Sequence, residues 1–138
     1  MLGWEGTLKE AFEPSVDQFR GEAEKVLKIK TLCLIAKVSA KSYGYMSPEE
    51  QAQEFGQYEY SRYRNFLSDA IGLADELSDE FYRDSALHLI LNLLMVAKEY
   101  VLAEKLYQVI KVDIIQKAIL KDHPQLASRD DQGSPDGL

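Results

Sequence analysis

The stretch Asp84–Tyr100 is the most apolar part of the chain, and its apolar positions cover well over half of the circumference of a helix. Between residues 84 and 97 the polar residues, Asp84, Ser85, His88 and Asn92, form one narrow stripe. A helix that is apolar on most sides needs neighbours on most sides, so we expect this one at the centre of an all-helical domain, with Ile90 and Leu94 almost fully buried. The apolar run is about half of the roughly 20 residues that a bilayer span requires, which argues against a membrane helix.

Helical periodicity and turn-forming residues divide the rest of the chain into further helices. The predicted helices span residues 15–42, 48–77, 79–100, 101–111 and 114–121. The expected N-caps are Ser15, Ser47 followed by Pro48, Ser78 and Asp113. The sequence therefore predicts one all-α domain of about five helices over residues 1–127. The polar tail 128–138 is rich in turn formers, and we expect it to be disordered.

The second predicted helix carries two irregular features. Glu59 falls inside its apolar arc, so either it finds a cation or a hydrogen-bond donor, or Gly56 bends the helix and returns it to solvent. Tyr45, Tyr58 and Tyr60 gather near the same end of the helix. Tyrosine-rich surfaces are enriched at interfaces, but tyrosine rings also simply cover a core, and the sequence leaves both interpretations open.

Composition and charge narrow the classes of function. At 138 residues, with 46% hydrophobic and 28% charged residues, the chain is typical of one globular domain. Its net charge of −7 argues against nucleic-acid binding as the main activity. The single cysteine, Cys33, lies in an apolar run and is expected to be a buried free thiol; together with the absence of a secretory pattern this favours a cytoplasmic location.

Charge is also divided between neighbouring segments of the chain. Residues 47–84 contain ten acidic and three basic residues, whereas residues 15–42 contain six basic and three acidic ones. We expect these two segments to lie side by side, with at least one lysine of the first near a carboxylate of the second.

The last predicted helix is more apolar than a short terminal helix needs. Ile114 and Ala118 make one apolar row, and Ile115 and Ile119 make a second row beside it. One row has a neighbour in the preceding helix, and the other needs a further cover. We therefore predict a homodimer through this helix, with the cover supplied by a second copy across a twofold axis.

Motifs of catalysis are absent from the sequence. It has no glycine-rich phosphate loop, no His-Glu-x-x-His and no Cys-x-x-Cys, so we predict no metal and no cofactor. Asp84 and His88 are four residues apart on one helix face, a spacing that favours a structural hydrogen-bonded pair over a catalytic one. A small enzyme or regulator with a site assembled from Asp84, His88, Glu59 and Tyr63 remains the alternative function.

The segment Arg83–Ile110 resembles a tetratricopeptide-type helix pair. Ala103, Tyr107 and Ile110 have the spacing of the packing residues on the second helix of such a repeat. Ala70, Leu73 and Leu77 recur as Ala103, Leu106 and Ile110 after a step of 33 residues, which is near the period of that repeat. The resemblance covers about residues 67–120 and implies antiparallel helix pairs that pack closely through small and aromatic residues.

These observations favour a non-enzymatic protein–protein interaction module, such as an adaptor, a scaffold component or an assembly chaperone. The predicted partner-binding residues are Tyr45, Tyr58, Tyr60, Ile114, Ile115 and Ile119. One open apolar groove would favour this function, whereas a closed polar pocket around His88 would favour the enzyme.

Overall fold

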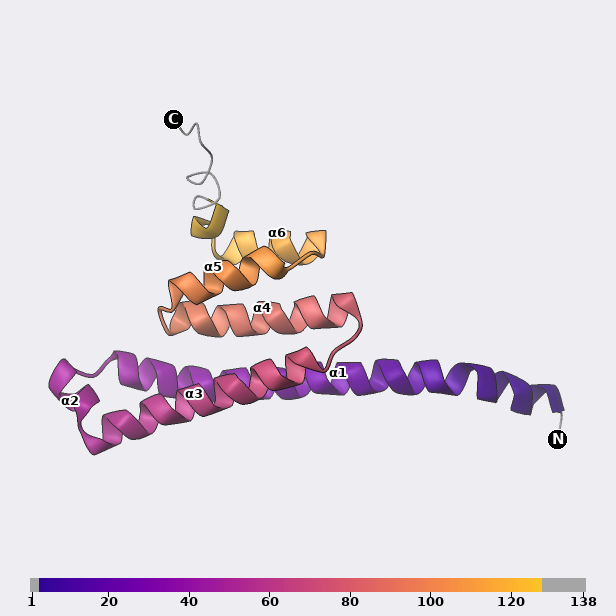
Figure 1. The fold of residues 1–138 in the computed structure, drawn as a ribbon, viewed down its shortest axis with the longest axis horizontal. Coiled ribbons are helices and arrows are strands. Elements are labelled where there is room, and N and C mark those ends of the chain that lie inside the picture. The colour runs from indigo at the N-terminus through magenta and orange to yellow at the C-terminus, as the bar shows by residue number, and fades with distance from the viewer. Residues whose placement is uncertain (1–2, 128–138) are drawn as a thin grey trace, which may run out of the picture.

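The computed structural model describes the backbone of residues 3–127 and the side chains of residues 20–127. Within that part it contains helices and no strand (Figure 1), which confirms the all-α class. The helices are α1 (Gly3–Gly44), α2 (Pro48–Ala52), α3 (Glu54–Asp75), α4 (Glu80–Val96), α5 (Tyr100–Val109) and α6 (Asp113–Asp122). None of these helices is long and apolar enough to span a bilayer. The predicted disorder of the tail 128–138 concerns residues outside the described part.

Helix α1 is the longest element and runs beside α3 (Figure 1). The prediction that a helix begins at Ser15 is wrong, because α1 continues through Pro14 and Ser15. A proline inside a helix removes one backbone hydrogen bond but does not always end the helix. The buried face of α1 carries Ile29, Cys33 and Ala36, spaced four and three residues apart, and α1 packs against α3 and α4. Cys33 is buried as predicted, and its burial raises the pKa of the thiol to about 11.

The predicted helix 48–77 is divided into two helices, α2 and α3. The cap at Ser47 is confirmed: the amide of Glu50 donates to the Ser47 hydroxyl, and the Glu50 carboxylate accepts from the Ser47 amide. The chain then becomes extended at Gln53 and starts again as α3.

Glycine at position 56 explains this division. A Cβ at Gly56 would lie 2.4 Å from the carbonyl oxygen of Glu50, so only glycine lets the backbones of α2 and α3 approach so closely. The bend therefore occurs at Gln53, and the expectation of a bend at Gly56 itself is wrong. Glu59, which follows on α3, is partly buried.

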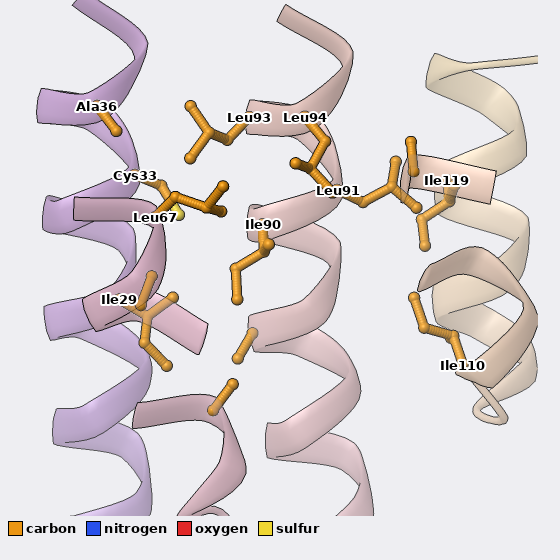
Figure 2. Close-up of a cluster of buried hydrophobic side chains, with 14 of the residues drawn as sticks. Ile29, Cys33, Ala36, Leu67, Ile90, Leu91, Leu93, Leu94, Ile110 and Ile119 are labelled. Atoms are coloured by element: carbon orange, nitrogen blue, oxygen red, sulfur yellow. The ribbon is translucent and has the colours of Figure 1, made fainter. Parts of the chain in front are cut away.

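Helix α4 occupies the centre of the fold. It lies between the pair α1 and α3 and the pair α5 and α6 (Figure 1), and it contacts all four of these helices. Leu93 points toward α1, and Leu91 points toward Ile119 of α6 (Figure 2). Ile90 is 1% exposed and Leu94 is 4% exposed, so their predicted burial is confirmed.

The boundaries of α4 differ from the prediction by a few residues. Its N-cap is Asp79, one residue after the expected Ser78, and the Asp79 carboxylate accepts from the amide of Tyr82 at 3.0 Å. At the other end, Lys98 has a positive φ of 63°, which turns the chain so that Tyr100 begins α5. The apolar positions of the stretch 84–100 thus lie in α4 and at its C-cap Ala97, and only Tyr100 belongs to α5.

The oppositely charged segments are neighbours, as predicted. Lys25 of α1 lies 3.3 Å from the carboxylate of Glu76 at the end of α3. In a second contact the acidic group lies on α1: the buried carboxylate of Glu22 accepts hydrogen bonds from the amides of Ser78 and Asp79, just before α4. These contacts join α1 to the α3–α4 connection. An exposed ion pair such as Lys25–Glu76 contributes little to the free energy of unfolding, typically below about 1 kcal/mol.

The C-terminal helix packs inside the chain's own core. Ile115 is 6% exposed and Ile119 is 0% exposed, whereas Ile114 is 67% exposed. The expectation that Ile115 and Ile119 form a partner-binding surface is therefore wrong, because α4 already covers this row (Figure 2). The predicted N-cap of α6 is also shifted: Val112 is the cap residue, and Asp113 is the first helical residue.

Candidate binding groove

Three helices enclose an open groove of about 800 Å³. Each of them contributes an apolar row with helical spacing. The rows are Leu67, Ile71 and Ala74 on α3, Leu87, Ile90 and Leu94 on α4, and Leu102, Leu106 and Val109 on α5. Because α4 is apolar on most sides, it contributes to this groove while also packing against α1 and α6.

The depth of the groove follows from the exposure of its lining. Leu67, Ile90 and Leu94 are buried and form the floor. The edges are formed by residues that keep much of their surface in solvent: Ile71 is 44% exposed, Leu102 is 42% exposed and Val109 is 52% exposed. Large apolar side chains that are exposed together mark a binding surface more often than isolated ones do.

The charged residues of the lining are mainly basic. They are Arg64, Arg83, Lys105 and Lys111, against one carboxylate, Asp75. Arg64 lies 3.6 Å from Glu99, and Arg83 lies 3.7 Å from Glu80 and 3.5 Å from Asp84, so both arginines have acidic neighbours. Lys105 and Lys111 are exposed and form no ion pair with any described residue.

Asp84 is fully buried near one end of the groove, beside Arg83. Its Oδ2 accepts hydrogen bonds from the backbone amides of Lys111 and Val112, at 2.8 and 2.9 Å. These amides lie at the start of α6, where the cap residue Val112 has no side-chain acceptor. Asp84 thus fixes the segment that leads into α6 to α4.

His88 does not form a pair with Asp84 but faces the end of α6. Its Nε2 lies 3.7 Å from a carboxylate oxygen of Asp122. One turn further along α4, Asn92 Oδ1 lies 2.7 Å from Nε2 of His123, and burial lowers the pKa of His123 despite the nearby Asp122 carboxylate. The polar stripe of α4 therefore contacts both ends of α6.

This arrangement does not support a catalytic site around Asp84 and His88. Neither residue lines the groove or the two smaller pockets of about 330 Å³ each. Glu59 and Tyr63, the other members of the alternative site, lie on α3. The hydroxyl of Tyr63 donates to Glu99, and its burial, reinforced by that carboxylate, raises its pKa. Asp84, His88 and Tyr63 therefore have separate structural partners.

The tyrosines proposed as partner-binding residues are exposed, but they do not form one surface. Tyr45 is largely exposed on the turn after α1, and Tyr58 accepts a hydrogen bond from Arg62 at 3.2 Å. Tyr60 packs against the rings of Tyr43 and Tyr63, with centroids 5.1 and 6.2 Å apart. Tyr58 and Tyr60 are two residues apart, about 200° around α3, and so face different directions.

A second exposed apolar surface lies along α1. Leu27, Leu34 and Val38 are each more than half exposed. Their spacing of seven and four residues places them on one side of the helix, opposite the buried Ile29 and Cys33. This row belongs to a single helix, whereas the groove is lined by three helices.

Sequence reasoning did not identify the groove. Comparison of the chain with known proteins gives no information on what the groove binds. Helices α4 and α5 are antiparallel neighbours (Figure 1), and Ala103 is fully buried between helices, as a tetratricopeptide-type pair would require. The resemblance itself stays a prediction. The chain matches no family model, no curated protein and no solved structure.

Proposed function

We propose that this protein is a non-enzymatic protein-binding module, an adaptor, scaffold component or assembly chaperone, and that its partner binds in the groove between α3, α4 and α5. The observation that carries the proposal is the convergence of three apolar rows on one open groove. The structure of the chain leaves Ile71, Leu102 and Val109 at its edges, and burying them under a partner would be favourable.

The size of the groove suits a segment of a protein. Its lining on α3 runs from Arg64 to Asp75, which corresponds to a length of about 16 Å. An elongated apolar groove of this length accommodates several consecutive side chains of a partner.

The chemistry of the lining disfavours an enzyme at the same place. Among the described residues that line the groove there is no histidine, cysteine, serine, threonine or tyrosine, and Asp75 is the only carboxylate. Nucleophilic and general acid–base catalysis depend mainly on such groups, usually placed within hydrogen-bond distance of one another. The groove thus has the composition of a binding surface.

Two matched variants test the proposal by affinity capture from extracts of the cells in which the protein is native. Val109→Glu places a charge in the groove, and Ile114→Glu places the same charge on an apolar side chain of similar size that lines none of the three pockets. Both side chains are more than half exposed, so both variants should fold, which circular dichroism can verify. We expect the wild type and Ile114→Glu to retain the same polypeptides and Val109→Glu to lose them. Equal retention by all three proteins would contradict the proposal.

A further inference from the structure

We propose that the occupant of the groove is an acidic amphipathic helix of another protein, with its apolar face on the three rows and its carboxylates toward Lys105 and Lys111. This inference rests on the function proposed above and specifies the chemistry of the partner. Its two parts, the helical form and the acidic charge, have separate support in the structure.

The helical form follows from the walls of the groove. The described residues contain no strand, so they offer no sheet edge on which an extended peptide could add a strand. The rows on α3, α4 and α5 have helical spacing, and helices pack by placing such rows beside each other. A partner helix of about three turns, with apolar residues at positions i, i+4 and i+7, matches the length of about 16 Å.

The acidic charge follows from the contrast between the groove and the whole chain. The chain has a net charge of −7, yet the groove lining has four basic residues and one acidic residue. Arg64 and Arg83 already have acidic neighbours, whereas Lys105 and Lys111 have no ion pair with any described residue. Complementary charge around an apolar centre selects the partner and its orientation.

The same charges disfavour a second copy of this chain as the occupant. The exposed apolar row that a second copy would offer along one helix is Leu27, Leu34 and Val38 on α1. Exposed lysines accompany this row, namely Lys28, Lys30 and Lys41. Docking the row in the groove would place lysines against lysines, and such juxtaposition of like charges opposes binding.

A selection experiment on the folded full-length chain tests the inference. The probe is a library of amphipathic helical peptides of about 16 residues, with leucines fixed at i, i+4 and i+7 and with the polar positions randomised among Glu, Lys, Gln and Ser. Peptides that also bind Val109→Gln are discarded; this uncharged polar substitution restricts the selection to the groove without favouring either charge on the peptide. We expect the retained peptides to be enriched in Glu over Lys.

Charge reversal then tests the named lysines with the most enriched peptide. Binding should weaken about tenfold or more in the double variant Lys105→Glu, Lys111→Glu. Binding of the peptide should remain unchanged in the control variant Lys30→Glu, because Lys30 is an exposed residue of α1 that does not line the groove.

Each contrary result overturns a different statement. Enrichment of Lys or of uncharged residues, or equal binding by the double variant, would overturn the acidic partner while leaving the groove as a protein-binding site. If no peptide distinguishes the wild type from Val109→Gln, and a fluorescent fatty acid does, the occupant is a small amphiphile and the proposed function fails as well. A dimer of the wild type that Val109→Glu dissociates would instead assign the groove to a second copy.

Discussion

Replacing Asp84 by Ala should lower the free energy of unfolding by about 3–5 kcal/mol, since the change removes a buried, hydrogen-bonded charge. The side chain is fully buried and accepts from the amides of Lys111 and Val112. Alanine would leave these two amides without their acceptor and Arg83 without one of its two acidic neighbours. Urea denaturation followed by circular dichroism measures the loss.

Two further variants make this prediction specific. Asp84→Asn keeps one acceptor oxygen, so it should cost less than Asp84→Ala. Asp113→Ala removes an exposed carboxylate that pairs with Lys117 at 3.0 Å on the same helix, and should change stability by no more than about 0.5 kcal/mol. If Asp84→Ala is as mild as Asp113→Ala, Asp84 does not hold the start of α6.

Replacing Leu93 by Ala should lower the free energy of unfolding by about 2–5 kcal/mol, because it leaves a cavity in the core. Leu93 is fully buried and points from α4 toward α1 (Figure 2). Leu102→Ala provides the control, since Leu102 is 42% exposed at the edge of the groove and should cost distinctly less. A cost for Leu93→Ala within about 0.5 kcal/mol, as is usual at surfaces, would show that α4 is not central.

The sequence pattern was sufficient to predict the features that depend on local chemistry. The apolar circumference of α4 predicts its central position, and Ser47, Pro48 and Glu50 predict a helix start that the structure reproduces in full. The break at Gln53 was not predictable in the same way, because it depends on the contact of Gly56 with the backbone of α2. That contact exists only after two helices have folded against each other.

The environment of α6 shows why Ile115 and Ile119 are not available to a partner. A polar stripe on a helix is ordinarily solvent-facing, but the stripe of α4 is not. Instead, Asp84 accepts from the amides at the start of α6, while His88 and Asn92 contact its end. The pattern of apolar and polar positions shows that a residue is polar, but it does not show which group is the hydrogen-bond partner of that residue. Ile115 and Ile119 are consequently buried in the chain's own core.

The groove was hidden from the sequence for a related reason. The rows on α3, α4 and α5 are visible as ordinary helical periodicity, and each could have been covered completely by its neighbours. Which apolar positions stay exposed depends on how the helices are placed. Ile71, Leu102 and Val109 were missed for this reason, whereas the tyrosines that the sequence singled out are exposed.

The most direct test of the central claim, that a partner binds between α3, α4 and α5, is site-specific photo-crosslinking. A photoreactive residue is placed in turn at Leu102 in the groove, at Leu34 on the exposed row of α1, and at Tyr45 on the turn before α2. All three side chains are exposed, so none of these changes should disturb the fold. The account predicts that the partner retained in affinity capture is crosslinked from position 102 and not from positions 34 or 45. Crosslinking from position 34 or 45, with none from position 102, would contradict it.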